Sequence, residues 1–348
     1  MNFILNGQAT GDIANKLLEA NFDVNALRPY IGSDGQSYIT QNVNGKPQAI
    51  VTNAPASLRK DDWILLDEAI VPAAKERLRL VADLRSAGLT FTIPNGMGKT
   101  VLETETQSDI SAARISMDGL TESQNDRPVF NLSSLPLPII HKDFSFSARQ
   151  IMASRNGGSP LDTTMAELAA RRVAEEAEKL ALGVAPSYKY GGGTIFGLTN
   201  FPSRITKVMT TPTGPATAGT TVTEILDMRQ SANTALHFGP YIIYNSPNWD
   251  KFLDDDFNTA KGDNTLRERI LKISNITAVT TADFLTGFQM ILVQQTSDVI
   301  REVIGMDITT IQWETRGGMQ LNFKVMAIMV PQLRADFNGN TGIVHGTA

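Results

Sequence analysis

Residues 89–140 limit the possible folds of this chain more than any other segment. They contain short runs of alternating polar and apolar residues, "LTFTI", "TVLETET", "ARISM" and "PVFNL", separated by Gly, Asn and Asp. This alternation is typical of β-strands, but the segment has too few apolar residues to form a core of its own. We therefore expect a long, strand-rich excursion that is stable only when it lies on another surface.

The segment "FTIPNGMGKTVLETETQ" (91–107) contains Gly98-Lys99-Thr100, the ending of a phosphate-binding loop. Such a loop needs a Gly five residues before its last Gly, and a following helix whose N-terminus faces the phosphates. Position 93 is Ile, and "VLETETQ" alternates like a strand. The sequence therefore predicts a glycine-rich turn at the start of the excursion, where Gly96 and Gly98 supply backbone freedom, and no nucleotide site.

The strongest local pattern predicts a long amphipathic helix. Thr164 and Glu167 have the spacing of a capping box, and Gly183 marks the end of the helix. About five helical turns separate these signals. The Ala-rich side of the helix permits close packing, and the residues expected on the packed side are Leu168, Ala169, Val173, Ala177 and Leu180.

The N-terminal part of the chain divides near residue 56. Residues 1–55 contain a short helical pattern around Ile13 and Leu17 and are otherwise rich in Gly, Asn, Pro and Gln, which is typical of an extended arm. From Ser57 to Gly88, apolar residues follow the three-and-four spacing of a helix. Pro72 is predicted to break this stretch into two helical pieces.

The remainder of the chain alternates helix and strand patterns. A glycine-rich loop at 191–197 and a Pro/Thr/Gly-rich linker at 211–220 precede an α/β region that runs to about residue 305. Its predicted elements are a helix at 221–237, a strand at 240–246, a helix at 265–273 and a strand at 289–295. The tail segments "ITTIQWET" and "LNFKVMAIMVPQL" predict an antiparallel pair that returns to a sheet beginning near residue 135.

Composition excludes several classes of protein. The chain has 348 residues, a formal net charge of -5 and 42% hydrophobic residues, which indicates a folded chain of one composite fold or two domains. Its acidic balance does not support a broad electrostatic grip on nucleic acid. The absence of cysteine removes disulfides and thiol chemistry. We found no export signal and no membrane-spanning run, and therefore expect a soluble product in the cytoplasm.

Residues that could carry catalysis or bind a metal do not form a recognisable set. His141, His237 and His345 lack the spacing of a metal site or a catalytic triad. The acidic run Asp254–Asp256 is predicted to be a solvated loop. The segment "DFNGNTG" (336–342) begins like a calcium loop, but its sixth position is Thr and no acidic twelfth ligand follows. We therefore expect no metal, no cofactor and no enzymatic activity.

The order of these segments resembles that of the Hong Kong 97-type capsid proteins, which include tailed-phage major capsid proteins and encapsulin nanocompartments. The similarity is strongest from Lys142 to Gly197, in the run-in "KDFSFSARQI", the helix block that ends at Gly183, and the following glycine loop. Trp63 and Asp67 resemble residues of the N-terminal helix of encapsulins. In order of segments, the resemblance covers residues 57–348.

The resemblance implies an α+β fold with a long spine helix, a P-domain, an A-domain, an extended E-loop and an N-terminal arm. It implies a homo-oligomer of pentamers and hexamers in an icosahedral shell. We predict these domain boundaries: N-terminal arm 1–56, helical segment 57–87, E-loop 88–134, P-domain 135–214 with 306–348, and A-domain 215–305.

The function that follows is that of the major capsid protein of a tailed phage, a virion protein assembled in the host cytoplasm. Such a shell encloses double-stranded DNA without sequence-specific binding, and scaffold, portal or cement proteins are possible partners. Some members crosslink an E-loop lysine to an asparagine of a neighbour, and Lys99 is a lysine in that loop. Lys99, Arg114 and Arg127 are the predicted inter-subunit contacts.

Two other functions stay open at this point. The first is an encapsulin-like compartment that holds a cargo enzyme, although the long N-terminal segment and the long excursion favour a phage capsid. The second is a soluble α/β enzyme whose site includes the glycine-rich loop at 191–197. Closed particles would favour a shell, whereas a monomer or dimer would favour the enzyme.

Overall fold

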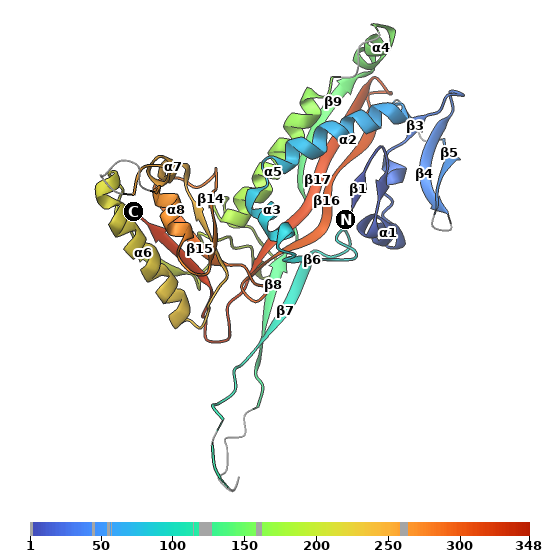
Figure 1. Cartoon of the computed structure of the whole chain (residues 1–348). Coiled ribbons are helices and arrows are strands. Elements are labelled where there is room, and N and C mark those ends of the chain that lie inside the picture. Colours follow the sequence, from blue (N-terminus) through green and yellow to red (C-terminus); the bar gives the residue numbers. More distant parts are fainter. Residues whose placement is uncertain are drawn as a thin grey trace. The chain divides into compact units, whose positions relative to one another are not determined.

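The computed structural model describes residues 3–43, 46–53, 56, 58–113, 115–117, 127–157, 162–257 and 264–348 (Figure 1). The chain forms two compact units. Unit 1 comprises Met1–Thr100, Leu137–Ala181 and Glu302–Val330, and unit 2 comprises Val101–Pro136, Leu182–Arg301 and Pro331–Ala348. In the parts of the chain that are described, no helix is long and apolar enough to cross a membrane.

Unit 1 is built on a four-stranded sheet with the order β6-β16-β17-β9. The strands are β6 (Thr90–Thr92), β16 (Ile300–Thr315), β17 (Gln320–Leu333) and β9 (Ile140–Ser147), of which the last residues of β17 and the first of β16 fall in unit 2. The predicted tail pair is confirmed, because β16 and β17 are neighbours in this sheet. Strand β17 also pairs antiparallel with β9, which joins the tail to the sheet that begins near residue 140.

Helices pack on this sheet, as Figure 1 shows for α2 (Lys60–Lys75) and α5 (Thr164–Leu182). Trp63 of α2 meets Phe323 of β17 edge to face at 5.9 Å between ring centroids. Phe144 of β9 stacks on the same Phe323 at 5.1 Å. These aromatic contacts join helix and sheet in one core. Helices α3 (Arg79–Ser86) and α4 (Ala148–Gly157) belong to the same unit.

Two helix predictions for unit 1 were wrong in detail. Helix α2 continues through Pro72 and ends at Lys75, so the break falls three residues later than expected. The Pro72 carbonyl still accepts from the Glu76 N–H at 3.1 Å, and burial of Ile70 and Ala74 on both sides of Pro72 favours the continuous helix. In α5, Leu168 is exposed, because Ala166, Ala169, Val173 and further alanines form the packed side instead.

The N-terminal segment contains more structure than its polar sequence predicted. The helix expected around Ile13 and Leu17 is confirmed as α1 (Asp12–Glu19). The sequence did not predict the strands around it, because their alternation is carried by Gln, Asn and Thr. These elements are β1 (Ile4–Leu5), β2 (Ala9–Thr10), the short 3-10 helix η1 (Asn25–Leu27), β3 (Tyr30–Ile31), β4 (Ser37–Val43) and β5 (Lys46–Val51).

Unit 2 contains a five-stranded sheet with the order β12-β18-β15-β13-β14. Its strands are β12 (Ile205–Val208), β18 (Ile343–Thr347), β15 (Gln289–Gln294), β13 (Tyr241–Asn245) and β14 (Ile276–Thr281). Three helices pack on it, α6 (Pro215–Thr234), α7 (Pro247–Leu253) and α8 (Leu266–Leu271). The predicted strands at 240–246 and 289–295 and the helix at 265–273 are confirmed.

One boundary in unit 2 was predicted wrongly. The expected linker at 211–220 is helical from Pro215, where α6 begins. Proline is tolerated at this first helical position because its missing N–H would have no partner within the helix.

A two-stranded hairpin completes unit 2. Strand β7 (Val101–Gln107) pairs antiparallel with β8 (Phe130–Pro136), and we call this pair the E-loop hairpin. Its two strands confirm the predicted excursion. The segment "ARISM" forms no strand among its described residues. The short strands β10 (Lys189–Tyr190) and β11 (Gly193–Thr194) lie in the glycine-rich loop, and β11 contacts β8.

Candidate assembly surfaces

The E-loop hairpin presents an apolar and acidic face that its own chain leaves open. Phe130 and Leu132, two residues apart on β8, are 58% and 57% exposed. Glu105 of β7 lies directly opposite Leu132, and Glu103 lies two residues further along the same face. Side chains on alternate residues of a strand point to one side of the sheet. We call the group of Glu103, Glu105, Phe130 and Leu132 the hairpin face.

The root of the hairpin is held within unit 2. Thr104 Oγ1 accepts a hydrogen bond from Gln332 Nε2 at 3.3 Å. Gly193 of β11 packs so tightly against β8 that a Cβ at this position would lie 2.2 Å from the Ser134 carbonyl oxygen. Leu135, near the end of β8, is buried. The hairpin is therefore fixed at its base and open along its length.

The glycine-rich loop at 191–197 packs against this root at Gly191 and Gly193. Besides the contact between Gly193 and Ser134, a Cβ on Gly191 would meet Val101 at 2.8 Å. The glycines thus allow the loop backbone to approach the hairpin, which is one of the roles that glycine serves in tight packing. The close contacts of Gly191 and Gly193 thus have a packing role at the hairpin root.

The glycine-rich turn before β7 belongs to unit 1 and packs against β16. The Gly98 N–H donates to Asn95 Oδ1 at 2.8 Å, and a Cβ on Gly96 would lie 2.4 Å from Gly305 of β16. The strand β7 follows Thr100, and β6 pairs with β16 rather than with β7. The turn therefore lacks the helix that a phosphate-binding loop requires, as the sequence predicted.

Two of the three residues predicted as inter-subunit contacts lie in the part of the chain that the structure describes. Lys99 is exposed just before β7, and Arg127 is exposed three residues before β8. Arg114 lies outside the described residues. Their contacts with another subunit stay a prediction.

Helix α5 presents a second open surface. Met165 and Leu168 are 51% and 47% exposed on successive turns. Arg171 and Arg172 lie on the next turn. Arg171 pairs with exposed Glu76 at 3.6 Å, and Arg172, itself exposed, pairs with the more buried Glu175 at 2.9 Å. Ion pairs at the surface contribute little to the stability of the fold. We call Met165, Leu168, Arg171 and Arg172 the helix face, which sequence reasoning missed because Leu168 was assigned to the packed side.

The N-terminal segment is anchored on α2 by a buried ion pair. Arg28 Nη2 donates to Asp67 Oδ2 at 2.5 Å, and both side chains are almost fully buried. The Arg28 guanidinium lies 4.4 Å from the centroid of the Trp63 ring, and the Gly7 N–H donates to the same Asp67 oxygen at 2.8 Å. Trp63 and Asp67, which carried the resemblance to encapsulins, therefore hold the N-terminal segment in place.

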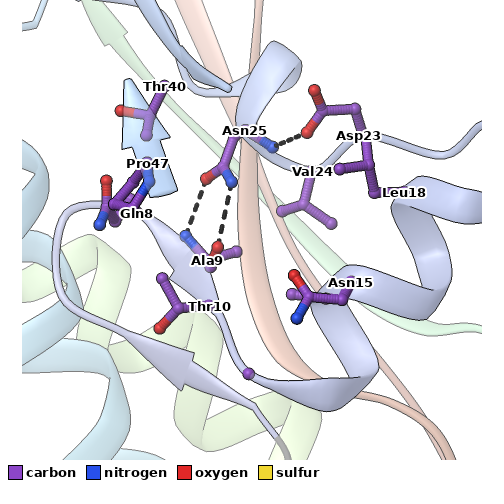
Figure 2. A pocket seen from close by; sticks show the side chains of 12 residues that line it. Gln8, Ala9, Thr10, Asn15, Leu18, Asp23, Val24, Asn25, Thr40 and Pro47 are labelled. Atoms are coloured by element: carbon purple, nitrogen blue, oxygen red, sulfur yellow. Dashed lines mark hydrogen bonds between the residues drawn. The ribbon is translucent and has the colours of Figure 1, made fainter. Parts of the chain in front are cut away.

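A pocket of about 250 Å³ lies inside the N-terminal segment (Figure 2). The Asn25 side chain crosses it: its Oδ1 accepts from the Ala9 N–H at 2.8 Å and its Nδ2 donates to the Ala9 carbonyl at 3.0 Å. Asp23 accepts from the Asn25 N–H and is the one ionisable side chain among the lining residues. The pocket holds no acid, base and nucleophile set of the kind that catalysis needs.

The histidines and the acidic run have structural partners. His345 accepts a hydrogen bond from Arg204 Nε at 3.4 Å, and burial, with a smaller contribution from Arg204, lowers the pKa of His345 to about 4. Asp254 pairs with Arg267 at 2.8 Å. Over the described ranges, no group of three or more His, Asp or Glu side chains could hold a metal ion.

Comparison with solved structures assigns the architecture to the Hong Kong 97-like capsid fold. The virus-like particle from Pyrococcus furiosus has a TM-score of 0.56 at 15% identity, covering 81% of this chain and 97% of its own. The Mycobacterium phage Bobi chain has a TM-score of 0.55 at 12% identity, covering 75% and 88%. The capsid of Myoviridae phage XM1 has a TM-score of 0.54 at 11% identity, covering 76% and 90%. The predicted α+β capsid fold is thus confirmed.

The family is narrower than the fold. Residues 53–346 match the model of a family described as "Family of unknown function (DUF6260)", and the chain belongs to that family. The chain is also 27% identical over 202 residues to the type 1 encapsulin shell protein EncA of Myxococcus xanthus (strain DK1622). That match covers 56% of this chain and 63% of the relative, so it spans less than two thirds of the relative's length.

Proposed function

We propose that the chain is the major capsid protein of a tailed phage and self-assembles into an icosahedral shell around double-stranded DNA. The observation that carries this proposal is the hairpin face, where Phe130 and Leu132 are more than half exposed beside two glutamates. A role in a shell accounts for such a face because a neighbouring copy covers it, and it requires no catalysis.

The helix face of a second copy has the chemistry that the hairpin face needs. The hairpin face combines two apolar side chains with Glu103 and Glu105, and the helix face combines two apolar side chains with Arg171 and Arg172. Burying a large apolar side chain contributes about 1.5–3 kcal/mol, while opposite charges set orientation and exclude wrong partners. The two faces are therefore complementary in both polarity and charge.

This pairing joins two different surfaces, so each copy offers one face to one neighbour and the other face to another. Such heterologous contacts produce closed assemblies where the symmetry closes and open filaments where it does not. The fold shared with phage capsid chains supports closure as pentamers and hexamers in a shell. In this proposal the protein assembles in the host cytoplasm and resides in the virion, with scaffold, portal or cement proteins as further partners.

The proposed domains follow the boundaries predicted from the sequence, with one adjustment. Strand β18 at the C-terminus pairs with both β12 and β15. An A-domain defined by its sheet would therefore begin at β12 and include β18 in addition to residues 215–305. The P-domain would keep β9, α4, α5, most of β16 and most of β17.

An encapsulin-like compartment is the second candidate, and the similarity to the Myxococcus shell protein favours it. The content of purified particles distinguishes the two functions. Nuclease-protected DNA would support the phage capsid, whereas a co-purifying cargo protein without DNA would support the compartment.

Lys99, Arg114 and Arg127 are proposed to contact neighbouring subunits, and Lys99 is positioned at the base of the hairpin, where it is exposed. If Lys99 forms a covalent crosslink, a denaturing gel of mature particles will show a ladder of oligomers. A single band at 37.8 kDa would exclude the crosslink.

Charge reversal tests the complementarity of the two faces. The double variant Glu103→Lys and Glu105→Lys is expected to sediment as free subunits, because like charges then meet across the interface. Combining it with Arg171→Glu and Arg172→Glu should restore large particles.

The matched control is Glu19→Lys with Glu68→Lys, which makes the same change of net charge at exposed positions. Wild-type sedimentation of the Glu103 and Glu105 double variant, or failure of the fourfold variant to assemble while the control does, would contradict this interface.

A further inference from the structure

A buried carboxylate lies between two helices of unit 1. Glu178 of α5 is 2% exposed. Its Oε1 accepts from the Leu80 N–H at 2.7 Å and its Oε2 lies 3.4 Å from the Val81 N–H, both in the first turn of α3. Glu178 forms no ion pair with any described residue. It thus caps α3 from a neighbouring helix without a cation to balance its charge.

The ionisable side chains around Glu178 and α3 include more carboxyl groups than basic groups. Arg85 of α3 donates to Glu302 of β16 at 3.0 Å and 3.5 Å and to Asp307 at 2.8 Å. Glu302 is also almost fully buried. Glu302 and Asp83 both act on Glu178 electrostatically. Arg85 therefore pairs with two carboxylates, Glu302 and Asp307, while the charges that act on Glu178 are both acidic, an arrangement that favours retention of a proton.

The pKa values of the two buried glutamates agree with this balance. Burial raises the pKa of Glu178 to about 7, against the opposing effect of the two α3 N–H groups. Burial likewise raises the pKa of Glu302 to about 7, although Arg85 acts in the opposite direction. The negative charge of Glu302 adds a smaller contribution that also raises the pKa of Glu178.

We propose that Glu178, Glu302 and Arg85 form a pH-dependent lock, which holds α3 between α5 and β16 while one proton is bound and loosens α3 when that proton leaves. The geometry carries the inference: one acid caps α3 from α5, and the other ties α3 to β16 through Arg85. The lock lies within unit 1 and is independent of whether the protein assembles into a shell.

The direction of the pH effect follows from the raised pKa. A carboxyl group whose pKa is higher in the folded state stabilises the fold fully below its unfolded pKa of about 4.5, and this stabilisation is lost as the pH rises through 7. Between pH 5 and pH 8, we expect the folding equilibrium of the wild type to weaken on the order of 100-fold from this cluster.

Thermal unfolding from pH 5 to pH 8.5 tests the lock. The variant Glu178→Gln keeps an acceptor for the Leu80 N–H but cannot ionise, so its Tm should fall less steeply with pH and exceed that of the wild type at pH 8. The matched control is Glu176→Gln, an exposed position on the same helix, which should keep the wild-type profile. An unchanged profile in Glu178→Gln would overturn the proposal.

Hydrogen exchange of the wild type gives a second test that needs no variant. Peptides covering α3 should lose protection between pH 6 and pH 8, beyond the intrinsic change in exchange rate. Peptides covering β13 and β15 serve as the internal reference. If the α3 peptides follow the reference, the lock does not exist. Because this measurement reports on α3, a failure of the shell proposal would not be mistaken for a failure of the lock.

Discussion

The N-terminal segment and the E-loop hairpin are similar in composition but differ in whether the described chain buries them. Both are rich in polar residues, and both form short strands. The N-terminal segment is joined to α2 by the buried contacts of Arg28 with Asp67 and Trp63. The hairpin is fixed at its base and exposes Phe130 and Leu132 along its length. The N-terminal segment has its partner surface in the same chain, whereas in the proposed shell a neighbouring copy supplies the partner surface of the hairpin.

This contrast explains how a polar segment can be ordered without a core of its own. A buried arginine is stable when a carboxylate and an aromatic ring surround it, because the charge is then paired and solvated by the protein. An exposed apolar face needs a second molecule to bury it, and large patches of this kind mark interaction sites. Variants of the N-terminal anchor should therefore lose subunit stability, whereas variants of the hairpin face should lose assembly.

The largest effect is expected at the N-terminal anchor. Replacing Asp67 with Ala leaves Arg28 buried without its partner, which should cost about 3–5 kcal/mol in the free energy of unfolding. Urea denaturation of the isolated subunit measures this loss. The control is Glu68→Ala, the exposed neighbour on α2, which should change stability by about 0.5 kcal/mol or less. Equal losses in both variants would show that Asp67 is no anchor.

A smaller effect is expected at the hairpin root. In Gly193→Ala, the new Cβ would meet the Ser134 carbonyl oxygen, so overpacking should cost about 1–3 kcal/mol. Gly219→Ala is the matched control. Gly219 lies inside α6, where a Cβ would have no atom within 4 Å, and Ala there should stabilise by about 0.5–1 kcal/mol. A loss of stability in Gly193→Ala together with a gain in Gly219→Ala would support a tightly packed root. No change in the stability of Gly193→Ala would contradict it.

The smallest effect on the subunit itself is expected along the hairpin. Leu132→Ala should change the stability of the isolated subunit by about 0.5 kcal/mol or less, because the side chain is already exposed. The same change should raise the protein concentration needed for assembly, as measured by light scattering. A large loss of subunit stability, or unchanged assembly, would place Leu132 outside an interface between copies.

Several features of the fold followed directly from residue patterns. The capping spacing of Thr164 with Glu167 and the end at Gly183 predicted α5, whose first turn is completed by a hydrogen bond from Thr163 Oγ1 to Glu167 Oε1. The apolar strands around Tyr241 and Ile291 were equally clear, since they are buried on both faces. Local patterns succeed where periodicity and burial agree.

Other features depended on contacts that a sequence does not display. Pro72 lies within α2 because buried residues on either side hold the helix together. Leu168 faces outward because the alanines of α5 make the close contact with the fold. The cluster of Glu178 and Glu302 joins residues more than a hundred positions apart. No local sequence pattern distinguishes these two glutamates from exposed ones.

Electron microscopy of negatively stained, purified protein tests the central claim most directly. Our account predicts closed icosahedral particles, because copies that pair the hairpin face with the helix face continue until symmetry closes the shell. Fields without closed particles, together with elution as a monomer or dimer in size-exclusion chromatography, would contradict it.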